Sequence, residues 1–397
     1  MNLDIQSYLN GQAFKIMRMV TVAALFIGCI TFQGVSDLRQ VHMIVFMLAM
    51  ISLFSLVLWN VWVTLFLLWT VFLYSYFKFT TGNIYLSYIL FGCIYYFIVK
   101  ISFKKEHIGF FINGFLWFLC LNVFYMAVQA LGYDFIFSQW AYDFFTGMSK
   151  HRTENVTPCG FMGHVSIMAS LIAMGVPLLA SRGSKWAWCG AGGLLFPLYI
   201  LHTSLCFLIG GAGLLFVLYF KIPRKIFLIM ICVVLLCGSF YVKNVDKLGM
   251  ERLPMWHKIL RDGMKHPITG WGLDSFSNVT PQKNFKYSQV VNKVPFNVDN
   301  YGNVQKEMTS ILWWDNPHNL YISLFYEFGF VGLFLFIGYI RQNVLRFKNC
   351  IKSPDAIALA GFVFVFLCIS IGHFPIFLAR TAICIIPVFA LLEITTS

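Results

Sequence analysis

The sequence predicts an all-α polytopic membrane protein, and three observations carry this prediction. Apolar residues make up 59% of the 397-residue chain and charged residues only 11%, fewer than half of the roughly 25% that soluble domains contain. Apolar runs long enough to cross a bilayer recur along nearly the whole chain. Basic residues flank these runs. We therefore expect one membrane domain over residues 1–397 instead of several soluble domains.

About twelve apolar runs approach the roughly 20 residues that a membrane-crossing helix needs. They cover residues 16–32, 41–58, 61–77, 84–101, 109–131, 161–180, 186–201, 203–220, 226–242, 319–340, 356–372 and 376–394. The divisions near Trp59-Asn60 and at His202 rest on short polar breaks. No small-residue cleavage site follows the first run, so we expect it to stay as a membrane helix.

The distribution of lysine and arginine predicts the topology. With the N-terminus in the cytoplasm, most basic residues of the short loops fall on the cytoplasmic side, as the positive-inside rule expects. The short outer loops hold little beyond Arg39 and Lys78. This arrangement predicts cytoplasmic termini and puts two long polar segments, residues 132–160 and 243–317, on the outer face.

The segment 243–317 is too long for a simple connector, because loops beyond about 15 residues are usually functional or disordered. Its tryptophans argue against a solvated linker. Pro254 is suited to open a short helix that lies flat on the membrane surface. We expect its apolar face to contain Leu253, Trp256, Ile259 and Leu260, and its basic face Lys258, Arg261 and Lys265.

The net charge of +13 does not indicate nucleic acid, because the basic residues flank hydrophobic segments and form no patterned stripe. Anionic lipids, or an anionic lipid-linked substrate, are the expected partners. The cysteines lie mostly in apolar runs without a Cys-x-x-Cys pair, and there is no Asp-x-Asp pair. We therefore predict a metal-independent activity without a cofactor.

Three stretches of the predicted outer face resemble the O-antigen ligase-like family. The first is Arg252-Leu-Pro-Met-Trp256 followed by His266-Pro-Ile-Thr-Gly-Trp-Gly272 and Phe276. The second is His318-Asn319-Leu-Tyr321 with Glu327 and Gly329. The third and weaker is Gly160-Phe-Met-Gly-His164 through Pro177. One departure is His202-Thr-Ser204-Leu205, which lacks the arginine of the Ser-Arg pair found in many relatives.

This resemblance implies a GT-C-like helical fold in the bacterial inner membrane with a periplasmic active site. Family members move a glycan from undecaprenyl diphosphate onto a hydroxyl of lipid A core sugar, of another lipid-linked glycan, or of a protein. The diphosphate leaving group needs positive charge, and an arginine fork suits it. The acceptor hydroxyl needs a base, for which histidine is the usual choice. The resemblance assigns His318 as the base and Arg252 to the diphosphate, while an interfacial helix cap and a headgroup contact are their ordinary alternatives.

Arg380 is a candidate on physical grounds, because an arginine in hydrocarbon costs at least about 2.5 to 3.5 kcal/mol on insertion scales. A diphosphate or a pair with Glu327 could offset that cost. Glu327 follows His318 by nine residues, about half a turn around a straight helix and about 13 Å deeper, so we expect no His-Glu dyad.

Other residues complete the predicted site. We expect substrate contacts at Asn319, Tyr321 and Trp256, and structural roles for Glu327, Gly270 and Gly272. Arg39 and Lys78 are possible outer contacts to the diphosphate, although headgroup anchoring explains them as well. His164 and His373 also stand at outer helix ends, where an ordinary interfacial role is the simpler interpretation.

The preferred function is an O-antigen ligase with lipid A core as acceptor. A polymerase that joins lipid-linked repeat units shares the same sites, and a protein acceptor is a third possibility. A polysaccharide transporter or flippase is a more distant alternative. Such transporters often show two related halves, whereas here only the second half carries a large outer loop.

Overall fold

The computed structural model describes two thirds of the chain, mostly in its helices. The described residues are 15–23, 60–77, 82–133, 158–162, 164–201, 203–223, 225, 227, 253–273, 275–276, 289–298, 304–312, 317–351, 353–372 and 379–396.

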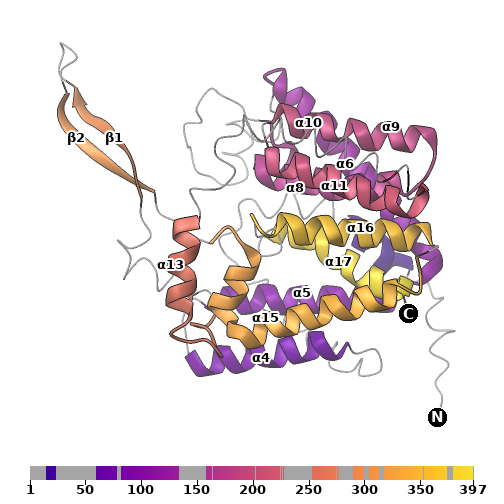
Figure 1. Cartoon of the computed structure of the whole chain (residues 1–397), viewed down its shortest axis with the longest axis horizontal. Helices are drawn as coiled ribbons and strands as arrows, with labels where there is room; N and C mark the ends of the chain where they lie inside the picture. The colour runs from indigo at the N-terminus through magenta and orange to yellow at the C-terminus, as the bar shows by residue number, and fades with distance from the viewer. Residues whose placement is uncertain are drawn as a thin grey trace.

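The described elements are predominantly helices (Figure 1). The α-helices are α4 (Val61–Phe77), α5 (Gly82–Ser102), α6 (Ile108–Ala130), α8 (Val165–Ala180), α9 (Lys185–Gly193), α10 (Leu195–Ile200), α11 (Ser204–Lys221), α13 (Leu253–Gly263), α15 (Leu320–Phe347), α16 (Pro354–Ile369) and α17 (Ala379–Thr396). Short 3₁₀ turns, η2 (Lys105–His107) and η3 (Gly160–Met162), precede α6 and α8.

Three of the described helical segments are long and apolar enough to cross a membrane: Lys105–Ala130, Ser204–Lys221 and Leu320–Phe347. Shorter apolar helices accompany them, and Figure 1 shows that most of these helices run along one common direction. The prediction of a helical membrane protein is confirmed. Runs 41–58 and 226–242 lie almost wholly outside the described residues.

The core of the bundle is built around α8 and α16, which pack against each other and against α11. Both helices are apolar on every side and buried almost along their whole length, as expected for helices enclosed by others. Small residues permit the close approach. A Cβ on Gly361 would lie 2.6 Å from the Cβ of Pro177, so only glycine fits at this crossing.

One end of the bundle, here called the α13 end, carries the elements of the long polar segment. In Figure 1, α13 runs crosswise to α4 and to the second half of α15. Its place on the membrane surface stays a prediction. An antiparallel hairpin of β1 (Gln289–Val298) and β2 (Val304–Leu312) extends beyond α13, with Val294 opposite Met308. Only short helices were predicted for this segment, so the hairpin is an addition.

Two predicted runs differ from the structure. The run 186–201 forms two consecutive helices, α9 and α10, which meet at Leu194, a residue whose backbone angles stay in the right-handed helical region. The run 319–340 is helical but not straight, because Gly329 has non-helical backbone angles. The two halves of α15 therefore point in different directions (Figure 1).

Candidate functional site

The start of α15 is tied to the end of α16 through Asn319. This buried residue has an extended backbone, and its Oδ1 accepts a hydrogen bond from the Ile322 amide at 3.0 Å. Its Nδ2 donates to the Ile371 carbonyl at 2.8 Å. The Leu320 amide also donates to the Ser370 carbonyl at 2.9 Å. Asn319 thus caps its own helix and clamps it to the residues that directly follow α16.

His318 is the only non-glycine residue with a positive φ among the residues that the structure describes. Its φ of 51° lies in the left-handed region, which costs a residue with a Cβ about 1–2 kcal/mol. Such strain persists only where surrounding contacts fix the backbone, and it is concentrated at functional sites. The half-buried His318 is therefore the most distinctive position at the α13 end.

The residue before His318 is held from the other side. The indole Nε1 of Trp256, on α13, donates to the Pro317 carbonyl at 2.8 Å. Two different elements therefore grip the backbone on either side of His318: α13 through Pro317, and the end of α16 through Asn319.

The inward face of α13 differs from the prediction. Met255 and Ile259 are buried against Ile322, Tyr326 and Phe276. Leu253 and Leu260, which were expected on the same apolar face as Ile259, are 47% and 41% exposed. Met255 is the residue that pattern reading missed. The reason is that α13 packs through positions 255, 259 and 263, where Gly263 allows close contact with the Phe325 ring.

A second tie between α13 and α15 comes from Asp262. Its Oδ2 accepts a hydrogen bond from the Tyr326 hydroxyl at 3.2 Å, and its Oδ1 pairs with Lys265 at 2.6 Å. The Asp262 carbonyl accepts the indole N–H of Trp271 at 3.2 Å. The Tyr326 bond ties α13 to the first half of α15, whereas the Trp271 bond ties the turn after α13 to the end of α13 itself.

The bend in α15 is made at Gly329. This residue has a φ of 69° and a ψ of −169°, a combination open essentially only to glycine. A Cβ at this position would overlap the Ile268 carbonyl. The bend removes intrahelical partners from the backbone groups around it, and those groups must be satisfied in another way.

The turn after α13 supplies most of these partners. The new hydrogen bonds run from Trp271 N to Tyr326 O (2.8 Å), Gly272 N to Glu327 O (3.1 Å), Phe330 N to Pro267 O (2.7 Å), and Trp69 Nε1 of α4 to Phe328 O (3.0 Å). Gly270 has a φ of 66°, and a Cβ on it would lie 2.6 Å from the Glu327 carbonyl carbon. Gly270 and Gly272 thus let the turn follow the bent backbone of α15.

Other predicted site residues have intramolecular partners or lie elsewhere. The Tyr321 hydroxyl donates to the Leu367 carbonyl of α16 at 2.7 Å. Glu327 is buried immediately before the bend. The bend at Gly329 comes after both His318 and Glu327, so the predicted spacing of these two residues along the helix stays a prediction. Arg252, Arg39, Lys78, His373 and the side chain of Arg380 lie outside the described residues.

The connection into α8 depends on two buried side-chain amides, Gln129 and Asn122, that no sequence motif contains. The Gln129 side-chain oxygen accepts the amides of Cys159 and Gly160 at 2.9 Å each, and the Asn122 oxygen accepts the Phe161 amide at 2.9 Å. Both amides stand in the apolar run of α6, where only their polarity could have drawn notice. They hold the turn that precedes the exposed His164, whose Nδ1 caps α8 by accepting the Ser166 amide at 3.2 Å.

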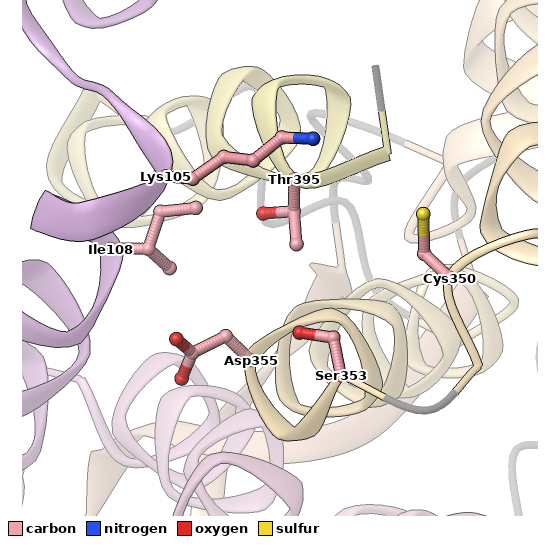
Figure 2. Close-up of a pocket in the computed structure, with 6 residues that line it drawn as sticks. All are labelled: Lys105, Ile108, Cys350, Ser353, Asp355 and Thr395. Carbon is pink, nitrogen blue, oxygen red and sulfur yellow. The ribbon is translucent and has the colours of Figure 1, made fainter.

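The cavity shown in Figure 2 belongs to the opposite end of the bundle. It has a volume of about 270 Å³. Its walls come from η2 and the start of α6, the connection between α15 and α16, the start of α16, and the end of α17, and they include Lys105, Asp355 and Thr395. His318 precedes α15 whereas Cys350 of this cavity follows it, so the cavity is separate from the His318 region.

Comparison with known proteins bears on the same region. Residues 163–337 match a family model described as O-antigen ligase. The match includes α8, α11, α13, the hairpin, the His-Asn motif and the bend of α15. No curated protein matches the chain. The family match confirms the resemblance carried by the motifs: over residues 163–337, the chain is similar to the O-antigen ligase family, a family of glycan transferases.

Proposed function

We propose that this protein transfers a glycan from undecaprenyl diphosphate to an acceptor hydroxyl at the periplasmic face of the bacterial inner membrane. The preferred acceptor is lipid A core, which makes the protein an O-antigen ligase. The observation that carries the proposal is the strained backbone of His318, gripped on both sides at the α13 end. The family match supports the reaction class.

In the proposed reaction, the acceptor oxygen attacks the anomeric carbon of the donor sugar. The bond between that carbon and the diphosphate oxygen breaks, and the electron pair leaves with undecaprenyl diphosphate. His318 accepts the proton of the acceptor hydroxyl. Arg252 and Arg380 stabilise the charge that develops on the leaving diphosphate, because one guanidinium group can donate hydrogen bonds to two phosphate oxygens at once.

Arg252 is placed in this scheme by its sequence position, since it directly precedes α13, whose Trp256 contacts Pro317. Asn319, Tyr321 and Trp256 were predicted as substrate contacts. Their polar groups make intramolecular hydrogen bonds, so we assign them to shaping the site. Arg39 and Lys78 remain candidates for an outer contact with the diphosphate.

A polymerase that joins lipid-linked repeat units would use the same residues and differ in the acceptor. The test uses purified protein in liposomes with a lipid-linked glycan donor and either lipid A core or a second lipid-linked unit as acceptor. Labelled glycan on lipid A core supports a ligase, and lengthening of lipid-linked chains supports a polymerase. Absence of transfer to both acceptors would contradict the proposal.

The reaction is proposed to need no metal. Addition of a chelator to the same liposomes is expected to leave the transfer rate unchanged, because the leaving diphosphate is neutralised by arginine side chains. Complete loss of transfer that returns when a divalent cation is restored would overturn this part of the proposal.

A further inference from the structure

We propose that Trp256 is a positioning residue for His318, and that it acts through the hydrogen bond from its indole N–H to the Pro317 carbonyl. This inference rests on the proposed function. It gives Trp256 a role in the orientation of the base instead of a contact with the substrate.

The hydrogen bond has the geometry and the support that this role requires. The 2.8 Å distance between Nε1 and the carbonyl oxygen is short for a neutral N–H···O bond. Trp256 is half-buried and packs in the small core that contains Met255, Ile259 and Tyr326. Packing in this core holds the indole ring in place while its N–H donates to the Pro317 carbonyl, next to the His-Asn motif.

The conformational cost at His318 and the contribution of one hydrogen bond are similar in size. The left-handed conformation of His318 costs about 1–2 kcal/mol, and an intramolecular hydrogen bond contributes about 0.5–1.5 kcal/mol. Loss of one bond therefore removes a large part of what offsets the strain. On the other side, Asn319 and Leu320 stay tied to Ile371 and Ser370. We expect the peptide between Pro317 and His318 to relax, which turns the imidazole away from the acceptor.

Trp271 provides a matched control in the same small core. Its indole N–H also donates to a backbone carbonyl, that of Asp262, at 3.2 Å. That carbonyl lies within α13 and is not adjacent to His318. Replacement of either tryptophan by phenylalanine keeps an aromatic ring and removes one N–H donor, so the two variants differ in the location of the lost bond.

The experiment compares Trp256→Phe with Trp271→Phe in liposomes that contain the lipid-linked glycan donor and lipid A core. We expect Trp256→Phe to lower kcat about tenfold, which corresponds to about 1.4 kcal/mol in the barrier, with the KM for the donor nearly unchanged. Trp271→Phe is expected to keep kcat within about twofold of the wild type, a change below about 0.5 kcal/mol. Equal kcat values for the two variants would overturn the positioning role.

A double variant tests whether Trp256 acts through His318. In a His318→Ala background, the Trp256→Phe change is expected to cause no further loss of the residual rate, because residues that act as a unit are not additive. If the double variant loses the product of the two single-variant losses in rate, Trp256 has a general structural role and does not act through His318. If Trp256→Phe fails to accumulate, benzothienylalanine at position 256 replaces the N–H by sulfur at nearly constant shape, and it should show the same loss of kcat.

These outcomes separate the inference from the proposed function. If His318→Ala is inactive and Trp256→Phe has the wild-type kcat, only the positioning role fails. If His318→Ala itself transfers glycan at the wild-type rate, the proposed function of the site fails.

Discussion

At the residue scale, the Asn319 side chain binds two elements: the start of α15 and the residues that follow α16. Its oxygen caps α15 and its nitrogen reaches the carbonyl of Ile371. A carboxylate would keep the capping oxygen and replace the donor by a second acceptor. The two functions of the amide can therefore be separated by a substitution that hardly changes its shape.

Asn319→Asp is expected to lower the free energy of unfolding by about 1–3 kcal/mol, because the Ile371 carbonyl loses its donor and faces an oxygen. Thermal unfolding in detergent measures the change. Asn113→Asp is the control: the Asn113 side chain uses its oxygen to accept from Arg182 at 2.8 Å, and aspartate keeps that contact. An equal loss in both variants would argue against the clamp.

The sequence identified residues at this scale better than it identified their partners. The His-Asn motif and Trp256 could be found because their residue types and order follow a family pattern. The bond between Trp256 and Pro317 joins residues 61 positions apart, and no local pattern contains it. Gln129 and Asn122 were missed for the same reason, since their partners lie in another segment.

At the scale of elements, the bend of α15 joins two motifs that are separate in the sequence. Gly329 makes the bend, and Gly270 and Gly272 let the turn after α13 come close to it. The turn then forms hydrogen bonds with the backbone groups of α15 that have no partner within the helix because of the bend. Apolar periodicity predicted a helix over 319–340 but could not show the bend, because the bend depends on a turn far away in the sequence.

Gly329→Ala is expected to lower the free energy of unfolding by about 3 kcal/mol or more, since both the backbone angles and the space exclude a Cβ. Gly211→Ala, in α11, is the control. No atom lies within 4 Å of the Cβ that it would add, and alanine favours the helix by up to about 1 kcal/mol. Unfolding measurements that rank Gly329→Ala as the more stable variant would contradict this account of the bend.

Across the whole molecule, a buried carboxylate joins four helices at the end opposite α13. Glu393 of α17 pairs with Lys100 of α5 at 2.9 Å and with Arg346 of α15 at 3.0 Å. The Tyr96 hydroxyl and the amide of Asn60, which precedes α4, also donate to it. The common partner of Lys100 and Arg346 could not be predicted from the sequence, because the three residues lie in three separate segments of the chain.

Glu393→Ala is expected to destabilise the protein by about 3–5 kcal/mol, because it removes the buried carboxylate that Lys100 and Arg346 share. The measurement is thermal unfolding, together with transfer per folded molecule, which should remain normal because the cluster is remote from His318. Glu106→Ala is the control, since its side chain is 69% exposed, and it should change stability by less than about 0.5 kcal/mol. A similar small effect of Glu393→Ala would argue against the cluster as a structural centre.

The helices themselves were largely predictable, because crossing a membrane imposes a local requirement on length and composition. The predicted run 61–77 has the bounds of α4, and the runs for α5, α6 and α11 agree within a few residues. The hairpin, the bend and the buried cluster depend on contacts between distant segments. Those features required the structure.

The most direct test of the central claim is the rate of glycan transfer by His318→Ala relative to His257→Ala. His257 is exposed on α13 near the same site, so the control makes the same chemical change on a neighbouring element. With equal amounts of folded protein in liposomes, we expect His257→Ala to transfer at nearly the wild-type rate and His318→Ala to lose transfer by at least about a hundredfold, the lower limit for a general base. Transfer by His318→Ala at the rate of His257→Ala would contradict the account.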